Sequence, residues 1–408
     1  MLKISLYVAL TALLLAGCSK SNDSQTLPAA LDAAMIAKNS IIIDTHIDVP
    51  YRLKSTPVNI SESTKSGDFD YPRAVSGGLD APFMSIYTPA SLEADGESKA
   101  VADKLIDLVN GFVEQWPDKF AIARSPDDVR TQFSAGIMSL PLGMENGSPI
   151  EGDLANLQYF YDRGIRYITL AHSASNHISD SSYDENRQWN GLSDFGREVV
   201  GEMNRLGIMV DISHVSDEAF WQVMEISAVP AIASHSSARH FTPGFERNMS
   251  DEMIIKLAAT GGVIQINFGS TFLTAAAHDY FTARTAAGVQ WLAENPQYTS
   301  SDAWRLFPEI YAVEHGALPF ATVEDVLDHI DHVVALTGVE HVGIGSDYDG
   351  VGDSLPVGLK DVSSYPNLVQ GLLDRGYTES DIKKILGENL LRVWQAVEDY
   401  AATTSSST

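Results

Sequence analysis

The sequence contains a single cysteine, Cys18, among 408 residues. A disulfide within the chain is therefore excluded, and so is a zinc site that binds its metal through thiolates. Any metal site must instead use the imidazoles of histidine and the carboxylates of aspartate and glutamate.

Basic residues are also scarce, with 27 lysines and arginines against 54 aspartates and glutamates and a formal net charge of -27. Such a surface repels the phosphates of nucleic acids, so nucleic acid is not an expected partner. The same charge favours solubility and raises the local concentration of divalent cations. Hydrophobic residues make up 44% of the chain, which is enough for a large core.

The N-terminus is typical of a bacterial lipoprotein. Lys3 precedes an apolar run, residues 4–16, that is too short for a comfortable membrane span, and Leu15-Ala16-Gly17-Cys18 follows. This pattern resembles the signal in which the cysteine is lipidated and becomes the new N-terminus, with an ordinary cleaved signal peptide as the alternative. We therefore expect a signal peptide at 1–17, a lipidated Cys18 on a flexible tether at 18–30, a folded domain at 31–400 and a disordered tail at 401–408.

The residue after the cysteine bears on localisation. Ser19 follows Cys18, and the aspartate that retains lipoproteins at the inner membrane is absent. The sequence therefore predicts a protein of the bacterial cell envelope, lipid-anchored to the outer membrane and facing the periplasm.

Eight short apolar segments alternate with amphipathic helical patterns. Most are continuously apolar and rich in β-branched residues, as in parallel strands whose two faces are both buried. The alternation of strands with helices indicates an α/β fold, and eight such strands favour a closed (β/α)8 (TIM) barrel. The predicted strands are residues 40–48, 79–87, 137–145, 166–172, 208–214, 229–235, 262–268 and 341–347.

Helices are predicted between these strands, and Ser216, Ser250 and Thr322 are expected N-caps because an acidic residue follows each within three positions. The interval 275–320, between strands seven and eight, is too long for one crossover. It is interpreted as an insertion with some helix that covers the top of the barrel or makes a dimer contact. The predicted helices are residues 154–163, 194–206, 216–226, 250–259, 323–336 and 379–397.

Six of the predicted strands end in histidine, aspartate or glutamate. A barrel brings the C-terminal ends of its strands together, and ionisable groups are rarely buried there without a shared purpose. The residues concerned are Asp44, His46, Asp48, Glu145, His172, Asp211, His214, His235, Asp347 and Asp349.

Five of these side chains could hold two metal ions. His46 and Asp48, two apart on one strand, point to the same side and could bind one cation, while His214 and His235 could bind a second. Glu145 could bridge both. Imidazole and carboxylate without thiolate suit Zn²⁺, with Mn²⁺ or Co²⁺ as substitutes. A single such histidine is more often structural, and only the combination indicates a catalytic metal centre, in which two ions would share and activate a water.

The segments around these residues, taken in order, resemble the membrane dipeptidase (renal dipeptidase) family of amidohydrolase-like metal-dependent hydrolases. The resemblance covers residues 40–397 and implies the (β/α)8 fold. The matching segments are DTHIDVP (44–50), GMENG (143–147), TLAHSASN (169–176), DISHVS (211–216), SHSSA (234–238), RNM (247–249), GSDYDG (345–350) and NLLRV (389–393).

The resemblance implies two zinc ions per chain, one held by His46, Asp48 and Glu145, the other by Glu145, His214 and His235. It also implies three further roles. His172 contacts the substrate carbonyl or its oxyanion, Arg247 binds the free carboxylate, and Asp347 is the acid–base residue and also contacts the substrate amine. The alternatives are that His172 is structural, that Arg247 is a surface residue, and that Asp349 replaces Asp347. Asp44 is expected to orient a ligand.

The implied activity is that of a metallo-dipeptidase. A metal-bridging hydroxide would attack the peptide bond of a free dipeptide of L residues, with a D residue allowed at the C-terminal position. The resemblance also implies a homodimer.

Two other functions stay open. One is a different amidohydrolase chemistry. No lysine occurs between Lys119 and Lys256, which argues against the subgroup whose metals are bridged by a carboxylated lysine, but hydrolysis of a lactam or lactone remains an alternative. The other is a lipoprotein that binds metal or peptide without catalysis.

Overall fold

The computed structural model describes residues 32–405, all of which belong to one compact unit. The predicted signal peptide, Cys18 and the tether lie outside the described residues, as do residues 406–408.

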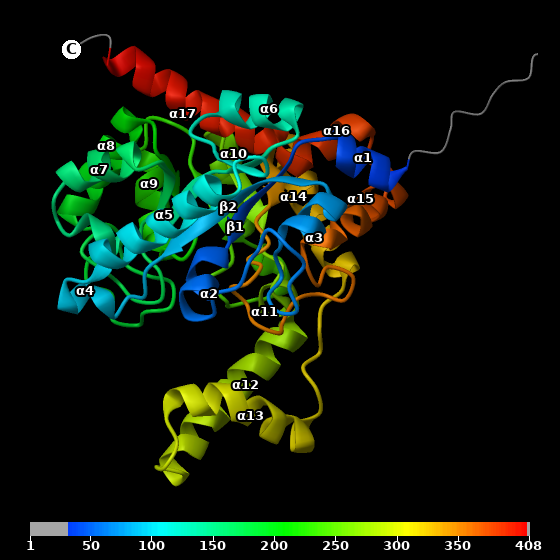
Figure 1. Cartoon of the computed structure of the whole chain (residues 1–408). Coiled ribbons are helices and arrows are strands. Elements are labelled where there is room, and N and C mark those ends of the chain that lie inside the picture. The colour runs from blue at the N-terminus through cyan, green and yellow to red at the C-terminus, as the bar shows by residue number, and fades with distance from the viewer. Residues whose placement is uncertain (1–31, 406–408) are drawn as a thin grey trace, which may run out of the picture. The chain divides into compact units, whose positions relative to one another are not determined.

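Eight parallel strands form the centre of the molecule and lie side by side in the order β1-β2-β5-β6-β7-β8-β9-β10 (Figure 1). The ring closes between its first and last strands, where the Asp347 N–H donates to the His46 carbonyl at 3.0 Å and the Asp48 N–H donates to the Tyr348 carbonyl at 2.9 Å. The predicted (β/α)8 barrel is confirmed. Its strands are β1 (Ile42–Ile47), β2 (Leu79–Tyr87), β5 (Leu142–Glu145), β6 (Ile165–Thr169), β7 (Met209–Asp211), β8 (Ile232–Ser236), β9 (Val263–Ile266) and β10 (Val342–Ile344).

The predicted strand 137–145 is two strands. Pro141 has no N–H to donate to a ladder, and it separates β5 from β4 (Met138–Leu140). β4 pairs with β3 (Phe120–Ile122) in a small parallel sheet of its own. The sequence patterns did not predict β3, whose three residues are too few to show a period.

Helices surround the strands, and the three predicted N-caps are present. The hydroxyl of Ser216 accepts from the Ala219 N–H, that of Ser250 from the Met253 N–H, and Thr322 forms a capping box with Asp325. The helices are α1 (Ala33–Asn39), α2 (Val49–Ser55), α3 (Tyr71–Gly77), α4 (Leu92–Asp95), α5 (Ser98–Gln115), α6 (Pro126–Ala135), α7 (Ala155–Asp162), α8 (Asp194–Leu206), α9 (Asp217–Ile226), α10 (Asp251–Ala259), α11 (Ser270–Leu273), α12 (Ala275–Glu294), α13 (Ser300–His315), α14 (Val323–Thr337), α15 (Tyr365–Asp374), α16 (Glu379–Lys383) and α17 (Asn389–Ser405).

The last predicted helix differs from its prediction in two ways. A π-helical segment, Lys384–Glu388, joins α16 to α17. α17 then continues to Ser405, so residues 401–405 are helical and do not form the disordered tail that we expected. In the described part of the chain, no helix is long and apolar enough to cross a membrane.

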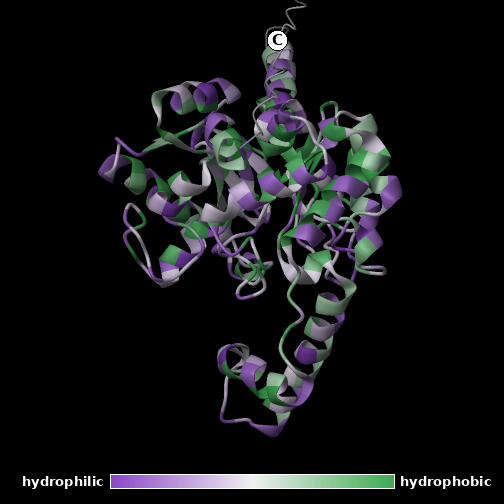
Figure 2. Cartoon of the chain, turned by 90° about the vertical axis from the view of Figure 1, so that its right-hand side faces the viewer, coloured by the Kyte–Doolittle hydropathy of each residue, from purple (hydrophilic) through white to green (hydrophobic). Residues whose placement is uncertain are grey.

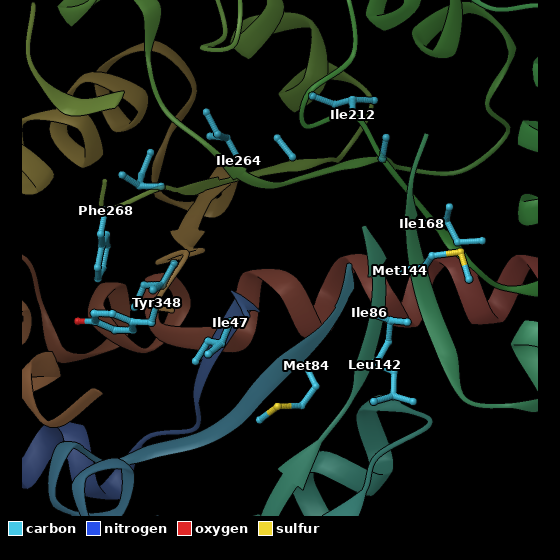
Figure 3. Close-up of a cluster of buried hydrophobic side chains, with 14 of the residues drawn as sticks. Ile47, Met84, Ile86, Leu142, Met144, Ile168, Ile212, Ile264, Phe268 and Tyr348 are labelled. Carbon is cyan, nitrogen blue, oxygen red and sulfur yellow. The ribbon is translucent and has the colours of Figure 1, made fainter. Parts of the chain in front are cut away.

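Alternate residues of the strands face two different cores. Ile47, Met84, Leu142 and Ile168 belong to the larger core (Figure 3). This core also contains apolar side chains of the surrounding helices. Their neighbours along the strands point into the barrel. Figure 2 shows hydrophobic segments gathered at the strands, with hydrophilic segments frequent on the outer helices. The barrel interior is filled at one end by Ile43, Phe83, Tyr167, Met209, Ile232 and Val263, together with Trp394 of α17. Polar side chains fill the other end of the barrel interior.

The predicted insertion lies between the seventh and eighth barrel strands, β9 and β10, as expected. It contains α12 and α13, which project from the barrel (Figure 1). The two helices pack on each other through aromatic rings, with the Trp291 and Phe307 centroids 5.7 Å apart. Only Ala277 of α12 is buried. Most of the insertion therefore projects from the barrel, although His278 near its start packs on Phe245 of the loop between β8 and α10. A dimer contact stays a prediction.

Candidate metal centre

The C-terminal end of the barrel gathers the predicted site residues from seven segments of the chain. His46 lies in β1 and Asp48 is the N-cap of α2. Glu145 ends β5, and His235 lies in β8. His172, His214 and Asp347 each come shortly after the end of a strand, and Arg247 lies in the loop between β8 and α10. The structure brings together His46, Asp48, Glu145, His172, His214, His235, Asp347 and, beside them, Arg247.

Glu145 stands between two groups of histidines. Its Oε2 lies 3.4 Å from His46 Nε2. Its Oε1 lies 3.2 Å from His214 Nε2 and 3.3 Å from His235 Nε2. Asp48 Oδ2 is 3.5 Å from His46 Nε2, on the first side. The two oxygens therefore face different imidazoles, Oε2 that of His46 and Oε1 those of His214 and His235, as in a carboxylate that bridges two cations. The His46 and His235 rings stack on each other, with centroids 3.7 Å apart, so the two sets of candidate ligands are adjacent.

The strand period explains why Glu145 points inward. Leu142 and Met144 of β5 face the helices, so Gly143 and Glu145 face the barrel interior. On β6, Ile168 faces the helices and Tyr167 the interior in the same way. The phenol of Tyr167 reaches 2.9 Å from His46 Nδ1 and donates to the Thr45 carbonyl at 3.0 Å.

Two of the histidines have a partner on the nitrogen that faces away from Glu145. Tyr167 contacts His46 Nδ1, and the Ser234 hydroxyl lies 2.7 Å from His235 Nδ1. Such partners orient the rings and direct Nε2 of each histidine toward the centre. We did not predict Tyr167 or Ser234 from the sequence. Alternate positions identify both as interior residues when counted back from the observed strand ends, Thr169 and Ser236, but not from the predicted ends at 172 and 235.

The chemistry of this group of side chains fits divalent cations. His46 Nε2 and Asp48 Oδ1 are buried and have no hydrogen-bond partner. Burial and the positive charge of Arg247 lower the pKa values of His214 and His235, which keeps both imidazoles neutral and able to ligate a metal. Burial raises the pKa of Glu145, but attraction to the imidazoles of His46 and His172 and hydrogen bonds from His172 and His214 outweigh burial and hold this pKa well below its usual value, so the carboxylate is charged.

Asp347 faces the same centre, and Asp349 does not. Asp347, His46 and Asp48 each place a ligand atom within 4.8 Å of the others. The Asn267 amide donates to Asp347 Oδ2 at 2.8 Å, and burial raises the pKa of this aspartate to about 7. Asp349 instead accepts from Arg52 Nε at 2.8 Å. Of the two aspartates that the sequence left as alternatives, the structure therefore places Asp347 at the centre.

Two residues of the centre have unusual backbone conformations. His214 has φ 69° and Asp347 has φ 64°, both in the left-handed region. Non-glycine residues there cost about 1–3 kcal/mol each and concentrate at functional sites. Asp44 helps to fix this backbone, because its carboxylate accepts from the N–H groups of His46 at 3.1 Å and Ser346 at 2.9 Å. It thus supports a candidate ligand through the main chain.

His172 and Arg247 flank the centre. His172 Nε2 lies 3.2 Å from Glu145 Oε1, and 18% of its side chain is exposed. Arg247 is buried, so it is not the surface residue that the sequence left open. Its Nη1 donates to the Ser236 hydroxyl and its Nη2 to the His235 carbonyl, each at 2.7 Å. Its Nε has no partner and can donate to an anion.

The chain is similar to known proteins over nearly its whole length. Residues 31–408 match the family model of the membrane dipeptidases, peptidase family M19. An uncharacterised dipeptidase of Schizosaccharomyces pombe is 33% identical over 88% of this chain and 81% of its own length.

Two solved bacterial structures are similar as well. The probable dipeptidase PvdM of Pseudomonas aeruginosa is 27% identical with a TM-score of 0.79, over 90% of this chain and 98% of its own. A metallopeptidase of Rhodobacter sphaeroides, solved with a phosphinate mimic of the dipeptide L-Ala-D-Ala, is 25% identical with a TM-score of 0.72, over 88% and 100%.

Proposed function

The chain belongs to the membrane dipeptidase family of metallopeptidases, and on this premise we propose that it is a two-zinc enzyme that hydrolyses free dipeptides. The observation that carries the proposal is the position of Glu145, whose two oxygens face two separate sets of candidate ligands. L,L-dipeptides are the proposed substrates, with a D residue allowed at the C-terminal position. The ligand of the Rhodobacter sphaeroides relative, a mimic of L-Ala-D-Ala, supports the second part.

Two metal sites are proposed. His46, Asp48 and Glu145 would hold one ion, and Glu145, His214 and His235 the other. Zinc is favoured because the ligands are imidazole and carboxylate, and Mn²⁺ or Co²⁺ could replace it. When bound, such a pair of ions polarises a carbonyl and lowers the pKa of water.

The chain's own residues supply the remaining steps. Arg247 binds the free carboxylate of the dipeptide through Nε, which has no partner, and through the second N–H of a terminal nitrogen. His172 donates from its ring to the oxygen of the scissile carbonyl as negative charge develops there. Asp347 takes a proton from the attacking water and passes it to the leaving amine. Because Asn267 occupies Oδ2, Oδ1 is the atom of Asp347 that carries the proton. Because Arg247 is buried and binds a free carboxylate, the site also excludes longer peptides, in which the carboxyl group of the second residue is part of a peptide bond.

The first experiment uses protein that begins after Cys18, stripped of metal and then supplied with zinc. We expect zinc-dependent cleavage of L,L- and L,D-dipeptides, and none of their C-terminally amidated forms. Glu145→Gln should lose both activity and about half or more of the bound zinc, because it removes the shared ligand, whereas the exposed Glu314→Gln should change neither. If the protein binds two zinc ions but cleaves no dipeptide, the dipeptidase assignment is wrong, whereas the proposal of two metal sites still stands.

We also propose that Cys18 is lipidated and anchors the enzyme to the outer membrane of a bacterial cell envelope, facing the periplasm. The sequence Leu15-Ala16-Gly17-Cys18 supports this proposal. Full-length protein expressed in a bacterium should incorporate a labelled fatty acid and sediment with outer membranes, and Cys18→Ser should do neither. Incorporation of the labelled fatty acid by the Cys18→Ser protein would show that the lipid is attached to another residue. The proposed homodimer is tested by light scattering of the soluble form.

A further inference from the structure

Three aromatic side chains stand beside Arg247 and have no role in the proposed mechanism. Tyr183 lies in the loop between β6 and α8, Phe245 in the loop between β8 and α10, and Phe272 in α11. The ring centroids of Tyr183 and Phe245 are 6.1 Å apart, and those of Phe245 and Phe272 are 5.8 Å apart. We call these three residues the aromatic wall.

The aromatic wall connects the carboxylate-binding arginine to the candidate metal ligands. At one end, the guanidinium carbon of Arg247 lies 5.4 Å from the centroid of Phe272. At the other, the ring of Tyr183 lies 5.8 Å from that of His214.

The wall is held in place and remains partly open to solvent. Asn248, in the same loop as Phe245, donates to the Phe272 carbonyl at 2.8 Å and so connects this loop to α11. His278 of α12 packs on Phe245 with centroids 4.3 Å apart. The Ser182 N–H donates to the His214 carbonyl at 2.7 Å, which fixes the loop of Tyr183. Nevertheless 44% of Tyr183 is exposed, so its ring can still bury apolar surface against a ligand.

The position of Arg247 indicates which part of a dipeptide would meet the wall. In a dipeptide, the C-terminal Cα carries both the free carboxylate and its own side chain, so the two are only a few bonds apart. A carboxylate on Arg247 therefore places the C-terminal side chain beside the wall. Tyr51 and Tyr87 form a separate aromatic pair that contacts His172, with the Tyr87 ring 4.8 Å from it. Within the described residues, no ring or cation–π contact joins Tyr51 or Tyr87 directly to Arg247, whereas Phe272 contacts it directly.

We propose that the aromatic wall binds the side chain of the C-terminal residue, with Tyr183 as its specificity-determining member, so that the preferred substrates are dipeptides with an aromatic or large apolar C-terminal residue. This inference rests on the proposed dipeptidase function. A phenylalanine side chain buries far more apolar area than an alanine side chain, so we expect kcat/KM for Ala-Phe to exceed that for Ala-Ala by about tenfold or more. Phe-Ala should gain no comparable advantage, because its ring lies on the other residue.

The test compares kcat/KM for Ala-Phe, Phe-Ala and Ala-Ala in the zinc-loaded enzyme. Tyr183→Ala should reduce the ratio of Ala-Phe to Ala-Ala severalfold, and Tyr183→Phe should keep the ratio because it keeps the ring. Tyr298→Ala is the matched control: this tyrosine is 39% exposed and stacks on Trp291 in the insertion. It should leave all three values unchanged.

The outcomes separate this inference from the proposed function. Cleavage of all three dipeptides at similar rates by the unmodified enzyme, or an unchanged ratio in a folded Tyr183→Ala enzyme, would overturn the inference and leave the dipeptidase assignment intact. Failure of the unmodified enzyme to cleave any dipeptide would overturn both. An advantage for Phe-Ala that Tyr183→Ala removes would place the wall at the N-terminal residue and would also overturn the inference.

Discussion

Asp347 and Asp349 are separated by one residue, yet their carboxylates lie in different surroundings. Asp347 is near His46 and Asp48, whereas Asp349 accepts from Arg52 and from the Asp68 N–H at 2.7 Å. Both have a positive φ, at 64° and 66°, which turns the chain sharply between them. The first carboxylate is thus available for proton transfer and the second holds the loop.

Asp347→Asn should therefore separate catalysis from metal binding. Asparagine keeps the shape of the side chain but cannot take a proton, so we expect kcat to fall by about 100- to 10,000-fold. Bound zinc should stay unchanged, because the proposed ligands are intact. Asp353→Asn, on the same loop and with a side chain that is 93% exposed, is the control and should behave like the unmodified enzyme. Full activity of Asp347→Asn would exclude the proposed acid–base role.

Another aspartate, Asp80 at the start of β2, should make the free energy of unfolding depend on pH. Burial raises its pKa from 3.8 to about 7, although it accepts a hydrogen bond from the Ile42 N–H. Between these two values the unfolded chain has released the proton and the folded chain retains it, so folding becomes less favourable as pH rises. At pH values above the pKa of Asp80 in the folded protein, about 7, this loss of stability is complete.

Asp80→Asn removes this titration and can still accept from Ile42. We expect the variant to be more stable than the unmodified protein at neutral pH, on the order of 1 kcal/mol after allowance for the partial exposure of Asp80. The advantage should shrink as pH is lowered toward 4. Urea unfolding at several pH values measures it, and a difference that does not change with pH would show that Asp80 titrates normally.

At the scale of single elements, the close contact between β5 and β6 positions a candidate ligand. Gly143 of β5 faces Tyr167 of β6, and a Cβ at this glycine would overlap the tyrosine ring. The same ring contacts His46 Nδ1. A small residue on one strand thus allows a large residue on the next to reach across the barrel to a third strand.

Gly143→Ala should disturb both stability and the site. Overpacking a filled interior costs about 1–3 kcal/mol, and a displaced Tyr167 no longer orients His46, so we expect a lower melting temperature and weaker zinc binding. Gly111→Ala in α5 is the control, because nothing lies within 4 Å of its added Cβ and alanine is the better helix former. It should be neutral or slightly stabilising. Unchanged zinc affinity in Gly143→Ala would show that Tyr167 does not support His46.

At the scale of the whole molecule, the excess of negative charge should limit stability. The net charge of -27 repels itself in the compact state. Raising NaCl from about 20 to about 200 mM shortens the range of this repulsion, since the Debye length falls below about 10 Å. We expect the melting temperature of the zinc-loaded enzyme to rise by a few degrees, measured at constant pH. A fall in the melting temperature would mean that attractive ion pairs contribute more to stability than the repulsion removes.

The sequence by itself determined the architecture and most of the candidate centre. Eight short apolar segments, most of them rich in β-branched residues, indicated buried parallel strands, and a barrel places the polar ends of such strands together. Family motifs added roles for His172, Arg247 and Asp347. The position of the insertion and the caps at Ser216, Ser250 and Thr322 also followed from local pattern, because caps and loops depend on neighbouring residues.

Only the tertiary structure decided which side chains meet. The split of strand 137–145 at Pro141 depends on the partner β3, which has no pattern of its own. The placement of Asp347 rather than Asp349, the burial of Arg247, the support of His46 by Tyr167 and the aromatic wall all join residues from distant segments. A sequence shows periodicity along one chain, whereas these contacts depend on distances between strands and loops that only the closed barrel fixes.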